Sequence, residues 1–83
     1  MELVQLIKRC DEMIEGYNAL QVLKSLQNMR PILKERNICT EYTVYSIIGL
    51  WIVVAQDLDT SKVRIYIVYK DWVKKMMKNQ KRN

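Results

Sequence analysis

The chain has 83 residues, of which 49% are hydrophobic and 28% charged, with two cysteines and no histidine. This length suits one domain, and the hydrophobic content argues against disorder for most of the chain. Without histidine, a zinc site built from Cys and His is excluded, and we expect neither a metal nor another cofactor. The longest apolar run, 47–55, falls short of the roughly 20 residues of a membrane span, so we expect a cytoplasmic, intracellular protein without a membrane partner.

The formal net charge of +5 is concentrated at one end of the chain. Residues 1–69 contain eight basic and eight acidic side chains, so they are neutral overall. Residues 70–83 contain six basic side chains and one acidic one, Asp71. This asymmetry predicts an anionic partner, and the alternative is a solubilising tail. The basic residues of this segment are Lys70, Lys74, Lys75, Lys78, Lys81 and Arg82.

The first half of the chain has the spacing of helices. Apolar residues recur every three or four positions over 2–17, which predicts an amphipathic helix that ends at Gly16. A second helical pattern covers 19–36, where Pro31 interrupts it. We therefore expect one helix to end near Asn28 and a short helix to follow over 31–36.

Residues 40–56 carry two conflicting signals. Thr40 can cap a helix, and Val44, Ile47 and Ile48 then share a helical face. The many β-branched residues between 43 and 54 favour a strand instead, but one strand of about 15 residues would exceed the usual 3–10. Dividing the segment at Gly49 predicts a helix over 41–49 and a strand over 51–56.

The last third is more regular. Residues 57–61 have the composition of a turn, and 62–70 alternate as a half-buried strand does, which predicts a hairpin with 51–56. Asp71 begins a basic C-terminal helix and tail over 71–83, with Trp72, Met76 and Met77 on one side of the helix and residues 81–83 expected to fray. The predicted fold is a single α+β domain of three or four helices, a two-stranded antiparallel hairpin and this C-terminal helix.

The predicted helix Thr40-Glu41-Tyr42-Thr43-Val44-Tyr45-Ser46, followed by a hairpin with a polar tip, resembles the winged-helix family of DNA-binding domains over about residues 18–70. In that family the helix before the hairpin enters the major groove, and the hairpin tip touches the backbone or the minor groove. The resemblance implies contacts to DNA from the helix and from the basic strand that follows the tip. The candidate residues are Tyr42, Thr43, Tyr45, Ser46, Lys62 and Arg64.

Three functions follow from these patterns, in order of preference. The chain has no nucleophile elbow, phosphate loop or dinucleotide fingerprint, so we expect a protein that is not an enzyme and has no small-molecule substrate. The leading prediction is a duplex DNA-binding transcriptional regulator, acting as a homodimer through its apolar stripe over 3–17 or 72–77. The alternative is a viral or plasmid accessory protein that docks on a partner protein through Trp72, Met76 and Met77, and a membrane-surface role is a third possibility.

Overall fold

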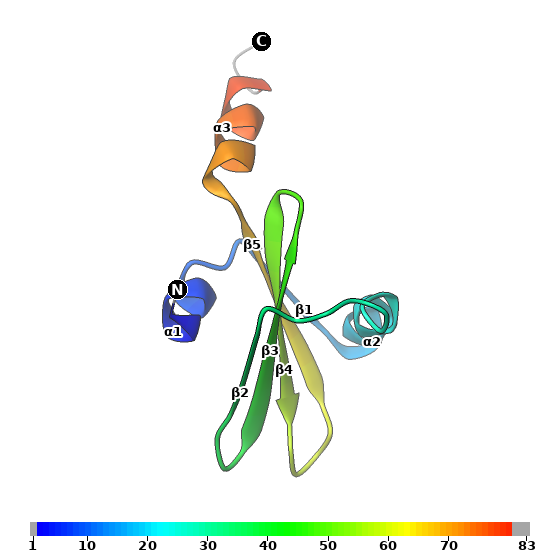
Figure 1. Ribbon diagram of the computed structural model, residues 1–83. Helices are drawn as coiled ribbons and strands as arrows, with labels where there is room; N and C mark the ends of the chain where they lie inside the picture. The colour runs from blue at the N-terminus through cyan, green and yellow to red at the C-terminus, as the bar shows by residue number, and fades with distance from the viewer. Residues whose placement is uncertain (1, 81–83) are drawn as a thin grey trace.

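The computed structural model describes residues 2–80, which form a five-stranded antiparallel sheet with one helix on each face and a third helix beyond one end (Figure 1). In chain order the elements are α1 (Leu3–Lys8), β1 (Glu12–Glu15), α2 (Gly16–Ser25), β2 (Leu33–Arg36), β3 (Thr40–Ile47), β4 (Leu50–Asp57), β5 (Val63–Tyr69) and α3 (Asp71–Gln80).

The sheet is a meander with one strand added at its edge. Strands β2 to β5 follow one another as consecutive hairpins, and β1 pairs with the free edge of β5, so the order is β1-β5-β4-β3-β2. Strand β4 is central, and its residues 52–55 are buried on both faces of the sheet. Burial on both faces explains why this segment is a continuous apolar run without alternation.

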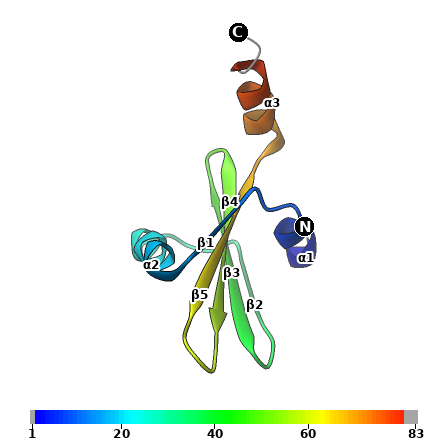
Figure 2. The ribbon, with the colours of Figure 1, turned by 180° about the vertical axis from the view of Figure 1, so that it is seen from behind.

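Each face of the sheet has its own hydrophobic core. On one face Ala19 and Leu26 pack against Ile52, Val54 and Ile65. On the other face Leu3 and Leu6 of α1 pack against Val44, Val53 and Val68. Figure 2, seen from behind, shows α1 and α2 on opposite sides of the twisted sheet. Successive residues of each strand face first one core and then the other, as the period-two geometry of strands requires.

The predicted fold class is wrong. Residues 40–47 form strand β3 instead of a helix, and the sheet has five strands instead of two. Pairing with both β2 and β4 buries Val44 to 1% exposure, and this tertiary packing outweighs the helical spacing and the capping threonine. Without a helix before the hairpin, the winged-helix architecture is not present in the described residues.

The predicted helices over 2–17 and 31–36 are also wrong in part. Helix α1 ends at Lys8 because the chain then pairs with β5. The backbone N–H of Asp11 donates to the Ile67 carbonyl at 2.8 Å. Residues 12–15 then continue as β1, and Gly16, at φ +68°, opens α2 instead of ending a helix. Residues 33–36 pair with β3 as the edge strand β2.

The predictions for the last third are confirmed where the structure describes it. Strand β4 covers the predicted 51–56, β5 covers most of 62–70, and a turn joins them. Helix α3 begins at Asp71 as expected. The predicted end of this helix over 81–83 lies outside the described residues.

Candidate functional site

Helix α3 is the amphipathic element that the sequence predicts. Asp71 lies in its first turn and Lys78 in its last, which matches the sign of the helix dipole at each end. At about 100° per residue, its apolar and basic side chains gather on opposite sides, namely Trp72, Val73, Met76 and Met77 against Lys74, Lys75 and Lys78. Figures 1 and 2 show α3 continuing from β5 beyond the end of the sheet.

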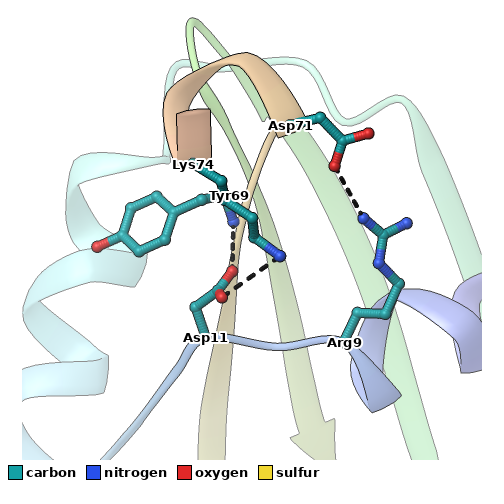
Figure 3. A network of polar contacts seen from close by, with 5 residues as sticks. All are labelled: Arg9, Asp11, Tyr69, Asp71 and Lys74. Carbon is teal, nitrogen blue, oxygen red and sulfur yellow. Dashed lines mark hydrogen bonds and ion pairs between the residues drawn. The ribbon is translucent and has the colours of Figure 1, made fainter. Parts of the chain in front are cut away.

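Polar contacts tie the start of α3 to the segment between α1 and β1 (Figure 3). Arg9 Nη2 lies 3.2 Å from Asp71 Oδ1, and Lys74 Nζ lies 3.5 Å from Asp11 Oδ1. The other oxygen of Asp11 accepts the backbone N–H of Tyr69 at 2.8 Å, at the end of β5. Exposed ion pairs of this kind stabilise a fold weakly, and these three contacts join the end of β5 and the start of α3 to the segment before β1.

The turn between β3 and β4 supports α3 from the other side. Gly49, at φ +90°, accepts the backbone N–H of Lys70 at 2.8 Å. A Cβ atom placed on Gly49 would lie 2.9 Å from Val73 Cγ2 and 3.5 Å from Trp72 Cζ2. Val73 therefore packs α3 against this turn, and only a glycine at position 49 leaves enough space for the Val73 side chain.

The rest of the apolar side of α3 is open to solvent. Trp72 is 50% exposed, Met76 52% and Met77 42%, and we call these three residues the α3 patch. Ile48, which precedes Gly49 in the turn below the helix, is 89% exposed. Large apolar side chains that remain exposed together on one side of a helix are typical of a binding surface. The three residues of the α3 patch are those the sequence predicts to contact a partner.

A recess lies beside the patch, between α3 and the ends of β1 and β5. Its volume is about 430 Å³, and Glu12, Tyr69 and Met77 are among its lining residues. Burial, followed by the nearby Glu12 carboxylate, raises the pKa of the Tyr69 phenol. The phenol therefore stays neutral over a wide pH range. Because the recess is open, Met77 is exposed to solvent on this side of α3.

The basic residues near α3 differ in how far they are already engaged. Lys70 Nζ donates to Ser46 Oγ at 2.9 Å and lies 5.2 Å from the centroid of the Trp51 ring, while Lys74 pairs with Asp11. Lys75 and Lys78 form no ion pair with any described residue. These two lysines are available to an anionic partner, whereas Lys81 and Arg82 lie outside the described residues.

The four hydroxyl residues predicted to contact DNA are not brought together. Successive residues of β3 point to opposite faces of the sheet. Tyr42 packs on the α1 side and Tyr45 on the α2 side, and both are partly buried. Ser46 is exposed, but its hydroxyl already accepts a hydrogen bond from Lys70. Thr43 is partly buried. Tyr42 and Ser46 therefore lie on one face of β3, and Thr43 and Tyr45 lie on the other.

Lys62 and Arg64 do share a face, together with Tyr66, at the opposite end of the sheet from α3. They line a hollow of about 770 Å³ next to the β4–β5 turn, which we call the hollow. Arg64 Nε lies 3.0 Å from Glu15 Oε1, and Arg64 Nη1 donates to the Tyr66 hydroxyl at 3.4 Å. The contact with Tyr66 and the Glu15 carboxylate raise the pKa of the Arg64 guanidinium, which therefore stays charged.

Sequence reasoning missed Ile48 and Gly49 of the β3–β4 turn, and it did not place the predicted site residue Tyr42 beside Arg64. Ile48 and Gly49 support and extend the surface around α3, and Tyr42 joins Arg64 at the hollow through the register of β3, β4 and β5. The run of β-branched residues over 43–54 was the signal that could have located them. A strand over 40–47 would have placed Tyr42 and Arg64 on one face.

The structure and the comparisons add three observations. Residues 2–80 contain no cluster of three or more side chains suited to hold a metal ion. In the same part of the chain, no helix has the length and apolar character needed to cross a bilayer. Comparisons with protein-family models, with curated proteins and with solved structures find no match to this chain.

Proposed function

We propose that this chain is a protein-interaction module that inserts α3 into an apolar, acidic-rimmed groove of a partner protein. The observation that carries the proposal is the α3 patch, in which Trp72, Met76 and Met77 remain about half exposed on a helix that contacts its own domain mainly through its first turn. An amphipathic helix that presents its apolar side to solvent is suited to fill a groove.

The composition of the patch fits a protein partner. Trp72 and Met76 are spaced i, i+4, so they stand one above the other on the helix and form two adjacent anchors. Tryptophan is enriched among the residues that dominate binding energy, and methionine adapts to irregular apolar surfaces. A partner groove lined by apolar side chains would cover both residues at once.

The charge beside the patch indicates the rim of that groove. Lys75 and Lys78 lie on the basic side of the same helix, and neither is neutralised by a described residue. Acidic side chains at the rim would pair with them and accelerate association at low salt. The same lysines would oppose close pairing of two α3 helices, so we favour a different acidic protein over a second copy of this chain.

Calcium-loaded calmodulin is a suitable probe, because its opened lobes present Met-rich apolar grooves that take basic amphipathic helices. We expect the full chain to bind it in isothermal titration calorimetry. The double variant Trp72→Ala/Met76→Ala should weaken binding at least about 30-fold, because truncating an anchor of this kind costs 2 kcal/mol or more. The matched control Val4→Ala/Leu20→Ala removes two exposed apolar side chains outside α3 and should leave binding unchanged.

Three results would contradict the proposal. The first is absence of binding to calmodulin, and the second is binding that the Trp72→Ala/Met76→Ala variant retains. The third is a role of Trp72 in another interaction. In that case Trp72→Ala would abolish co-sedimentation with anionic vesicles, or a dimer detected by light scattering, and would leave calmodulin binding unchanged.

Nucleic-acid binding is a second candidate, because the whole net charge lies in residues 70–83 and Lys75 and Lys78 have no acidic partner among the described residues. Contacts would go to DNA phosphates from the six basic side chains of residues 70–83, without a winged helix. Six such contacts predict a log–log salt slope of about −5 in duplex binding, measured by fluorescence anisotropy between about 50 and 200 mM salt. Lys75→Gln/Lys78→Gln should reduce the slope by about 2. No binding at the lower salt would exclude this candidate.

A further inference from the structure

The hollow at the far end of the sheet is separate from α3 and has its own chemistry. It lies next to the turn that joins β4 and β5, and its lining includes residues of β1, β3, β4, β5 and the start of α2. Its volume of about 770 Å³ is within the range of small-ligand sites, about 300–1,000 Å³.

Three residues form a row across the floor of the hollow. Tyr42 on β3 pairs with Ala55 on β4, and Ala55 pairs with Arg64 on β5. Neighbouring strands are about 4.8 Å apart, so the backbones of Tyr42 and Arg64 are separated by about 10 Å. A planar ring that contacts one group on each of its faces needs those two groups to be about 7 Å apart. Ala55 has only a methyl group, all three residues line the hollow, and we call the space above Ala55 between Tyr42 and Arg64 the slot.

The guanidinium of Arg64 is held before any ligand arrives. Glu15 accepts from Nε at 3.0 Å and Tyr66 accepts from Nη1 at 3.4 Å, which leaves Nη2 without a partner among the described contacts. A guanidinium restrained at two of its nitrogens loses less freedom when a flat group stacks on it. The flat faces of tyrosine and arginine are the groups on which proteins stack nucleobases.

Two basic and two acidic side chains line the hollow, and Lys62 is the one of the four whose side chain makes no hydrogen bond or ion pair with a described residue. Lys62 lies two residues from Arg64 along the chain, about 7 Å away, and forms no ion pair with a described residue. The two acidic residues of the lining are engaged: Glu15 pairs with Arg64, and Asp57 Oδ1 accepts the backbone N–H groups of Asp59 and Thr60 at 2.8 and 2.9 Å. These two hydrogen bonds lower the pKa of Asp57, so its carboxylate stays ionised while it organises the turn.

We infer that the hollow binds one nucleotide of a single-stranded nucleic acid, with the base between Tyr42 and Arg64 and the phosphate at Lys62. A base within a duplex is paired and stacked, so it cannot enter the slot. A free mononucleotide carries the same base and phosphate. The inference uses no residue of α3, so it stands or falls independently of the proposed docking function.

The test is fluorescence anisotropy of a labelled single-stranded oligothymidine with the full chain at about 50 mM salt. Ala55→Leu fills the slot without changing the charge and should weaken binding about 5- to 150-fold, which corresponds to the 1–3 kcal/mol that stacking of one base contributes. Arg64→Ala should have a similar effect. Lys8→Ala removes an exposed cation outside the hollow and should change binding less than about twofold. A thermal melt of each variant shows whether it is folded.

The outcomes separate the alternatives. Loss of binding in folded Ala55→Leu, with weaker binding of the matching duplex, supports the inference. Thymidine monophosphate that binds as tightly as the oligomer identifies a free nucleotide as the source of the same chemistry. Oligomer binding that Ala55→Leu and Arg64→Ala both retain overturns the inference, as does no binding at all. Displacement by an acidic aromatic peptide, but not by nucleotides, overturns it too.

Discussion

Replacing Ile65 with alanine is expected to lower the free energy of unfolding by about 3–4 kcal/mol. Ile65 is fully buried, and it pairs with Ile14 on one neighbouring strand and Val54 on the other. Helix α2 covers it through Ala19 and Leu26, so the cavity left by the substitution cannot fill with solvent. A chain of this length is stabilised by only about 4–12 kcal/mol in total, so the variant would be close to unfolding at 37 °C.

Urea denaturation followed by circular dichroism measures this change. Ile38→Ala is the matched control, because it removes the same atoms from a side chain that is 94% exposed and should shift stability by no more than about 0.5 kcal/mol. Equal midpoints for the two variants would contradict the core assigned to the α2 face.

Gly49→Ala is expected to destabilise the fold by about 2–4 kcal/mol and to displace α3. The backbone at Gly49 has φ +90°, a conformation that costs an L-residue about 1–2 kcal/mol. The added Cβ would also lie 2.9 Å from Val73 Cγ2, so Val73 and the helix that bears it must move. We therefore expect weaker calmodulin binding as well as a lower melting temperature.

Gly16→Ala separates the two contributions. Gly16 also has a positive φ of +68°, but a Cβ there meets nothing within 4 Å. This variant should pay only the backbone cost of about 1–2 kcal/mol and leave binding unchanged. If both variants had the same melting temperature, the contact between Val73 and the β3–β4 turn would not be stabilising.

Local patterns predicted the elements whose partners are close in sequence. Strands β4 and β5 form a hairpin across a short turn, and the Asp57 carboxylate that organises this turn bonds to residues two and three positions away. Helix α3 has its apolar and basic residues on opposite sides, which the spacing alone shows. For these elements the sequence signal and the tertiary structure agree.

The elements that failed depend on distant partners. Residues 12–15 continue the apolar spacing of the first helix, yet they form β1 because β5, more than 45 residues later, offers an open edge. The position of Val44 fits a helical face as well as a strand. The strand forms because it buries Val44 between α1 and the sheet. The same error concealed the hollow, because Tyr42 and Arg64 become neighbours only through the pairing of β3, β4 and β5.

The most direct test of the docking function is nuclear magnetic resonance of the full chain during a calmodulin titration. The methyl groups of Met76 and Met77 and the indole N–H of Trp72 report on the α3 patch itself. We predict that their signals shift together with those of Ile48, at one binding constant, while the methyl signals of the buried Val53 and Ile65 stay in place. Shifts that leave the three patch residues unchanged, or that appear throughout the cores, would contradict the account.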